Sequence, residues 1–283
     1  MLLGSATRNV AWLFVNVSGD VTKNAAGAVG TAVGADILWL EGLVLPLNIT
    51  ATVGLVQALA RVEAPVLPLG RSSLAEVGMR VVVGGSGGRK RSVASRIVAK
   101  QEFSGYWEYV LDEAIFTAPA HPFWGGTAMI GPSGELLGIG SLQIQQAVSN
   151  PKTRTTHKGD DANMIVPIDL LNPIFDDLIT IGRPNRPARP WLGLYATEIG
   201  SSVAIVGLAS RGPAQKADLR AGDVVMAVAG GQVTNLAGLF RSVWAQGAAG
   251  VTVPMTINRE GRTFDVAVRS VDPNIPSSSR STR

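Results

Sequence analysis

A proline-rich segment divides this chain of 283 residues into two parts. Residues 183–190 read RPNRPARP, with three prolines in eight positions. Closely spaced prolines hold the backbone extended and lack N–H donors, so the segment cannot continue a helix or a central strand. We therefore expect one domain over residues 1–182 and a second over residues 191–272. Residues 273–283 contain four serines and two arginines and are expected to be disordered.

Short apolar runs between glycine, proline and asparagine turns predict a mostly β first domain. Residues 11–17 read AWLFVNV and are rich in strand-forming side chains. Such a succession of short, turn-bounded strands is typical of an antiparallel barrel. Residues 165–181 change to a helical period, and Asp169 can cap that helix. Further strands are expected at residues 35–45, 52–59, 79–84, 93–101, 107–111, 126–131 and 135–146.

The composition excludes several kinds of site. There is no cysteine, which rules out disulfides, cysteine-based metal sites and cysteine nucleophiles. The two histidines, His121 and His157, lack flanking metal ligands at a suitable spacing, and residues 153–161 around His157 are expected to form a polar loop. No Gly-Lys-Ser/Thr sequence follows the glycine-rich residues 84–88, so they do not form a phosphate loop. We expect no metal and no cofactor.

The chain is basic, with a net charge of +4 and a pI of about 9.7. Part of this charge lies in residues 89–91 (RKR) and in the C-terminal tail. Two solvated basic segments explain the balance, although a basic nucleic-acid or membrane-surface binder stays open as an alternative. Because no motif interleaves basic and aromatic residues, we expect no nucleic-acid partner.

One apolar segment has the length of a membrane span. Residues 37–60 are largely apolar, but Glu41, Pro46 and Asn48 interrupt them, and Pro46 would break a helix. Buried strands fit this segment better, so no integral membrane span is expected. The N-terminus has no basic residues ahead of its first apolar residues and is not a clear signal peptide.

The second domain carries four local motifs. Residues 191–194 read WLGL, and residues 212–225 read GPAQKADLRAGDVV. Asn235 is expected to cap a helix, and residues 259–262 (REGR) predict a hairpin turn before the last strand. Together these motifs resemble a PDZ domain, which implies a β-sandwich or barrel with two helices. The predicted helix presents one apolar face, made of Leu236, Leu239, Phe240 and Val243.

The PDZ resemblance implies a peptide-binding groove. In such domains a peptide C-terminus adds as a strand, and its carboxylate accepts hydrogen bonds from the amides of an apolar-Gly-apolar loop. The alternative, that these residues only form the core of the domain, stays open. The implied peptide-binding residues are Trp191, Leu192, Gly193, Leu194, Leu236, Phe240 and Val243.

Residues 116–140 read FTAPAHPFWGGTAMIGPSGELLGIG and resemble the segment that carries the nucleophilic serine of HtrA-type serine proteases. Residues 165–181 resemble the segment that closes the protease domain of that family. The resemblance implies a trypsin-like double β-barrel over residues 1–182, with a first barrel that is either complete or truncated. Oligomers and a periplasmic or envelope location are also implied by the family.

A serine protease needs a nucleophilic hydroxyl, a base and an orienting carboxylate. When the family pattern is laid on this chain without gaps, its serine falls on Gly125 and its aspartate on Val53. No histidine precedes His121 in this sequence. We therefore expect no catalytic residues, and His121 is expected to hydrogen-bond the backbone of its own loop. Trp124 either fills the former cleft or packs in the core.

Three functional hypotheses follow. The first is an inactive HtrA-like protein, a pseudoprotease, that binds peptide C-termini or unfolded segments in protein quality control or regulates a true protease. The second is an active serine endopeptidase with an unusual constellation that uses Ser86 or Ser141 as the nucleophile. His121 stays open as an acid or base in an unrelated reaction. Ser86 lies in GGSGG, which imitates a nucleophile loop but precedes RKR, so a flexible glycine loop is the simpler interpretation. The third is the basic binder described above.

Overall fold

The computed structural model describes residues 67–85, 88–144 and 161–273, together with the backbone of residues 145–150 and 155–160 and of four N-terminal strands. The chain forms two compact units. The first unit comprises Met1–Gln101 and Glu113–Asn185, and the second comprises Glu102–Asp112 and Arg186–Arg283. The division between them falls inside the proline-rich segment. Residues 102–112, which lie within the first domain expected from the sequence, therefore belong to the second unit.

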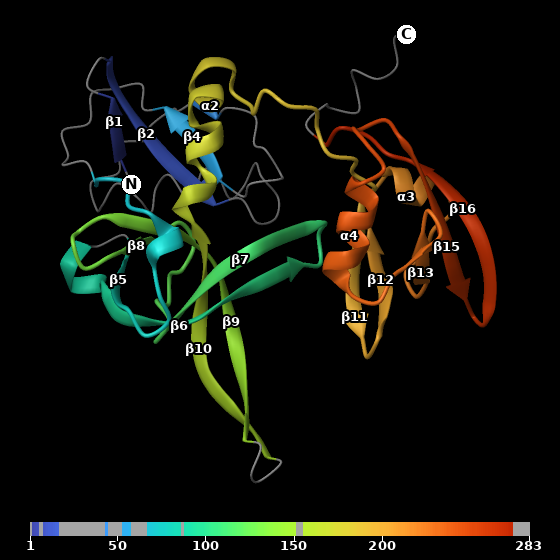
Figure 1. Ribbon diagram of the computed structural model, residues 1–283, viewed down its shortest axis with the longest axis horizontal. Helices are drawn as coiled ribbons and strands as arrows, with labels where there is room; N and C mark the ends of the chain where they lie inside the picture. Colours follow the sequence, from blue (N-terminus) through green and yellow to red (C-terminus); the bar gives the residue numbers. More distant parts are fainter. Residues whose placement is uncertain are drawn as a thin grey trace. The chain divides into compact units, whose positions relative to one another are not determined.

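The N-terminal strands form an antiparallel sheet in the order β1-β2-β4-β3 (Figure 1). The strands expected at residues 11–17 and 52–59 are both present. Val53 is the first residue of its strand and pairs with Asn16. The strands are β1 (Leu2–Ser5), β2 (Arg8–Asn16), β3 (Leu43–Val44) and β4 (Val53–Gln57).

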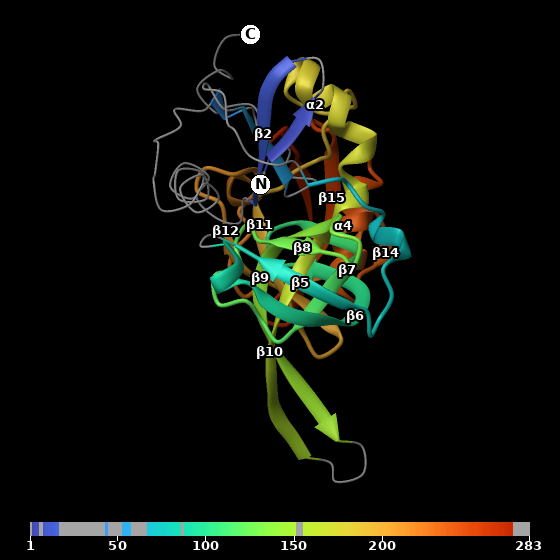
Figure 2. The same cartoon turned by 90° about the vertical axis from the view of Figure 1, so that its left-hand side faces the viewer.

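The rest of the first unit is a closed barrel of six strands in the order β10-β7-β6-β5-β8-β9 (Figure 2). Alternation places one face of each strand inside. In β5, for example, Val81 and Val83 are buried, whereas Arg80 and Val82 are exposed. The strands are β5 (Arg80–Gly84), β6 (Val93–Gly105), β7 (Tyr109–Ala118), β8 (Ala128–Ile130), β9 (Leu136–Asn150) and β10 (Thr155–Pro167).

Strands β9 and β10 form a long hairpin that extends past the barrel (Figures 1 and 2). Our expectation of a polar loop over residues 153–161 is wrong, because residues 155–160 are part of β10. The sequence of these residues has no alternation of apolar side chains, so backbone pairing with β9 stabilises them as a strand. His157 pairs with Val148 in this hairpin.

The single helix expected over residues 165–181 is also wrong in detail. Strand β10 continues to Pro167 and is followed by the 3-10 helices η3 (Ile168–Leu170) and η4 (Asn172–Ile174), and then by α2 (Phe175–Ile181). Pro173 in η4 lacks an N–H and prevents one continuous helix.

Asp169 lies in η3 and does not cap α2. Its carboxylate accepts hydrogen bonds from the N–H groups of Ser72 and Ser73, at 3.0 and 2.8 Å. Ser72 and Ser73 begin the 3-10 helix η1 (Ser72–Leu74). Partial burial acts to raise the pKa of Asp169, but these hydrogen bonds hold it below its usual value.

The second unit has a sheet in the order β11-β12-β13-β15-β16, with β14 paired to β13. Its two helices match the expected architecture, and α4 lies against β11 (Figure 1). The strands are β11 (Leu194–Ile199), β12 (Ser202–Leu208), β13 (Val224–Val228), β14 (Gly231–Gln232), β15 (Thr252–Arg259) and β16 (Arg262–Arg269). The helices are α3 (Pro213–Lys216) and α4 (Leu236–Trp244).

Two local predictions for this unit are confirmed. The Asn235 side chain caps α4 by accepting a hydrogen bond from the Gly238 N–H at 2.7 Å. Glu260 and Gly261 adopt φ angles of 51° and 81°, as a tight turn between β15 and β16 requires. Among the described residues, no helix is long and apolar enough to cross a membrane.

Candidate functional site

The loop ahead of β11, residues 191–194, forms a cradle of backbone amides, and we call it the carboxylate loop. The N–H groups of Leu192, Gly193 and Leu194 all donate to Oε1 of Glu108, at 3.1, 2.6 and 3.1 Å. The Leu192 N–H also lies 3.1 Å from Oε2. Gly193 has a φ of 72°, a conformation that glycine adopts without strain. Successive N–H groups that converge in this way make an anion-binding site.

Glu108 comes from the tip of the β6–β7 hairpin, residues 102–112, which we call the hairpin tip and which belongs to the second unit. The residue is only 6% exposed and has a φ of 61°. Burial raises the pKa of its carboxyl to about 7, although the three N–H donors act to lower it. The carboxylate loop is therefore occupied by a carboxyl group from the same chain.

The predicted walls of the peptide groove are core residues. Five of the seven predicted residues are at most 6% exposed within the core of the second unit. Val110 of the hairpin tip packs against the same core. Trp191 is half-buried, and its backbone pairs with Val271. The five residues are Leu192, Leu194, Leu236, Phe240 and Val243.

His121 is bound on both sides of its ring by backbone groups. Its Nε2 lies 2.7 Å from the carbonyl oxygen of Arg91, and its Nδ1 accepts a hydrogen bond from the Phe123 N–H at 3.1 Å. These contacts assign the ring proton to Nε2. The Asn163 carboxamide also binds the backbone of His121, which is 1% exposed. Both ring nitrogens are therefore occupied in holding the loop.

Gly125 lies exposed in the same loop, between β7 and β8. The amides around it are used within the fold. The Gly126 N–H donates to the Gly140 carbonyl at 2.9 Å, and the Thr127 N–H donates to the carbonyl of Trp124 at 3.2 Å. The Trp124 side chain is half-buried. These contacts maintain the shape of the loop without presenting those two amides to a ligand.

The two serines considered as alternative nucleophiles are Ser86 and Ser141. Ser86 and the side chain of His157 lie outside the described residues. Ser141 is on β9 and is completely buried.

Comparisons with known proteins find a PDZ domain in this chain and a similarity to HtrA serine proteases. The PDZ domain family matches residues 190–270. The serine protease Do-like HtrA of Bacillus subtilis (strain 168) is 24% identical over 171 residues, which is 54% of this chain and 35% of that protein. The serine protease Do-like HtrB of the same organism is 22% identical over 162 residues, or 52% and 33%. This chain is homologous to the HtrA serine proteases and carries a PDZ domain.

The matches cover only about a third of the length of these curated HtrA relatives. Among solved structures, the HtrA-type protease AlgW with a decapeptide has a TM-score of 0.50 and 16% identity, over 83% of this chain and 72% of that one. At this identity the likeness shows the fold alone, a mostly β HtrA-type trypsin-like fold with a PDZ domain.

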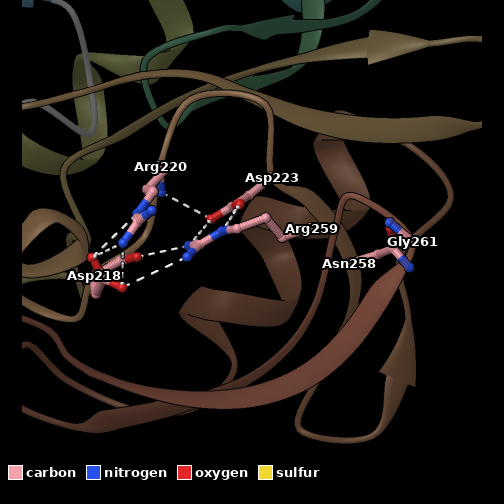
Figure 3. Close-up of polar contacts among 6 residues, drawn as sticks. All are labelled: Asp218, Arg220, Asp223, Asn258, Arg259 and Gly261. Carbon is pink, nitrogen blue, oxygen red and sulfur yellow. Dashed lines mark hydrogen bonds and ion pairs between the residues drawn. The ribbon is translucent and has the colours of Figure 1, made fainter.

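An ionic network inside the PDZ domain of this HtrA homologue was not expected from the sequence (Figure 3). Asp223 is completely buried and accepts hydrogen bonds from Arg259 Nε at 2.6 Å, Arg259 Nη2 at 2.8 Å and the Arg220 N–H at 2.8 Å. Burial acts to raise the pKa of Asp223, but these donors hold it below its usual value. The exposed Asp218 lies at the outer side of the network, 3.6 Å from Arg259 Nη1. The Gly-Asp pair at residues 222–223 could have indicated this network in the sequence, because an aspartate that directly precedes a buried strand needs hydrogen-bond donors.

Glu108 was also missed. Residues 107–111 were expected to be a strand, which would have made Glu108 one position in a regular alternation. The structure instead ends β6 at Gly105 and begins β7 at Tyr109, so Glu108 lies in the turn between them. Nothing in the local sequence connects this turn to a loop more than eighty residues later.

Proposed function

We propose that this HtrA homologue is a pseudoprotease that binds peptide C-termini, or the free ends of unfolded segments, through its PDZ domain. The observation that carries the proposal is the convergence of three N–H groups of the carboxylate loop on one carboxyl group. A loop whose backbone donors converge on one carboxyl group is chemically suited to the terminal carboxylate of a peptide. The adjacent edge strand β11 offers the backbone groups with which a peptide strand pairs.

The loss of proteolysis is supported by the residues at the family positions. Gly125 and Val53 have no group that could act as a nucleophile or orient a base. His121 has both ring nitrogens bound to backbone groups, so neither is available to accept a proton from a serine. A role as an adaptor, or as a regulator of a true protease, follows from binding without cleavage, and we extend the proposal to homo-oligomers and to the bacterial envelope.

Two measurements test the proposal. The purified chain is incubated with fluorescent casein beside a Ser86→Ala variant, and no turnover is expected in either. Turnover that disappears in Ser86→Ala would overturn the pseudoprotease assignment.

Fluorescence anisotropy then compares fluorescein-labelled decapeptides that end in an apolar residue, with either a free or an amidated C-terminus. Saturable binding of the free acid and loss of binding on amidation are expected, since the amide removes the anion that the loop recognises. Equal binding of the two peptides would contradict carboxylate recognition.

A further inference from the structure

The hairpin tip lies along β11 in the direction that a peptide ligand strand would take. The Ala196 N–H of β11 donates to the carbonyl oxygen of Tyr106 at 2.9 Å, and the Leu194 N–H donates to Glu108. The tip therefore advances toward the carboxylate loop as β11 runs away from it, which is the antiparallel arrangement. Because β11 is at the end of the sheet order, its outer edge is the one available for strand addition.

The end of this short strand resembles a peptide terminus in its chemistry. Glu108 delivers a carboxyl group to the same three amides that would hold a terminal carboxylate. Its position in the left-handed region of backbone space turns the chain away at that point. A side-chain carboxylate after a tight turn can therefore replace a main-chain carboxylate that ends a peptide.

Flanking contacts hold the tip beside α4. Arg241 of α4 pairs with Glu102 at 2.6 Å and with Asp112, one residue on each strand of the hairpin. Tyr106 meets Tyr195 of β11 edge to face, with ring centroids 5.9 Å apart. The ion pairs are exposed and each contributes little, so Glu108 and the pairing with β11 supply most of the specificity.

We propose that the hairpin tip is an internal ligand of the PDZ domain, so that a peptide C-terminus binds only by displacing Glu108 from the carboxylate loop. The inference rests on the proposed peptide-binding function and adds its regulation. The three N–H groups cannot serve two carboxylates at once, and the edge of β11 at Ala196 cannot pair with two strands. Occupancy by a peptide and occupancy by the hairpin tip therefore exclude each other.

The first test measures affinity for the labelled free-acid decapeptides in the full chain, in Glu108→Ala and in Glu113→Ala. Glu113 is the matched control, because it lies on the same hairpin, is exposed, and pairs with Lys100 instead of the carboxylate loop. We expect Glu108→Ala to bind at least tenfold more tightly than the other two proteins. Equal affinities in all three proteins would overturn the internal ligand and leave the proposed function intact.

Hydrogen exchange provides a second readout that needs no peptide. The amides of Leu192, Gly193 and Leu194 should exchange much faster in Glu108→Ala than in the full chain or in Glu113→Ala. Unchanged exchange would overturn the proposal even if no peptide bound to any protein. If no peptide bound to any of the three proteins but the three amides exchanged faster in Glu108→Ala, the proposed function would be rejected and the internal contact would stand.

A conservative variant addresses the possibility that Glu108→Ala unfolds the domain. Glu108→Gln keeps the Oε1 acceptor and the shape of the side chain, so the fold should persist, as circular dichroism would verify. Saturating free-acid peptide should also increase hydrogen exchange at residues 106–110 of the full chain. Peptide binding that leaves exchange at the tip unchanged would contradict displacement.

Discussion

Raising the pH from about 5 to about 7.5 should weaken the contact between the hairpin tip and the carboxylate loop. In the docked state the pKa of Glu108 is raised to about 7 from 4.5. A carboxyl whose pKa is raised by docking binds its proton more tightly when docked. The proton therefore stabilises the contact fully when the pH is below 4.5, the pKa of the released side chain. This stabilisation is lost as the pH rises through about 7, the pKa of the docked side chain.

The size of the effect follows from the two pKa values. Their difference corresponds to about 3 kcal/mol over the whole range, since one pKa unit is worth about 1.4 kcal/mol. Between pH of about 5 and 7.5 the docking equilibrium should weaken on the order of 50-fold. Because docking competes with peptide, the affinity of the full chain for the free-acid decapeptide should rise over the same interval relative to that of Glu108→Gln, by up to that factor, since the peptide's own carboxylate is buried alike in both proteins.

Fluorescence anisotropy titrations at several pH values measure this effect, with Glu108→Gln as the control. The glutamine variant cannot titrate at this position, yet it keeps the other charged groups around the tip. These groups are Glu102 and Asp112 on the hairpin, Arg241 on α4 and Arg189 ahead of β11. A rise in affinity in the wild-type chain that is absent in Glu108→Gln is expected. Identical pH profiles of the two proteins would refute the reasoning.

Three further predictions concern the PDZ domain. Asp223→Ala should lower the free energy of unfolding by about 2–3 kcal/mol, and the melting temperature by roughly 10 °C or more, because it removes three hydrogen bonds from a buried carboxylate. The exposed Asp218→Ala is the control for thermal unfolding and should change little; equal shifts would argue against the network. Asn235→Ala removes the cap of α4 and should cost about 1 kcal/mol in denaturant unfolding, whereas no change would show that the cap is dispensable. Gly193→Ala should abolish binding of the free-acid decapeptide, because its φ is 72° and a Cβ would lie 3.0 Å from the Trp191 ring; retained binding would count against the cradle geometry.

Local signals in the sequence predicted much of the PDZ domain. The cap at Asn235, the apolar face of α4 and the turn at residues 260–261 each depend on residues close together in the chain. The strand at residues 155–160 could not be predicted in this way, since its polar sequence has no alternation and its partner strand determines it. The helix over residues 165–181 was overestimated because apolar spacing outweighed the effect of Pro173.

For the site itself, the sequence predicted the carboxylate loop but not the group that occupies it. The resemblance of the WLGL sequence to the carboxylate-binding loop of PDZ domains predicted these amides, and in the structure they hold a carboxyl group. Its occupant was not predictable, since Glu108 reaches the loop only through the tertiary path of a hairpin. Similarly, Gly125 at the family's serine position led us to expect no nucleophile, but the contacts that engage both nitrogens of His121 required the structure.

In the proposed competition, the tethering of Glu108 to the same chain determines how easily an external peptide can replace it. A tethered ligand acts at an effective concentration on the order of millimolar, so an intrinsic dissociation constant of about 100 µM would keep the loop roughly tenfold more often occupied than free. An external peptide of the same intrinsic affinity would then bind roughly tenfold more weakly, so it displaces the tip only where a terminal apolar side chain adds affinity. In the proposed competition, the hairpin tip would in this way set a threshold of affinity for peptides that bind the PDZ domain.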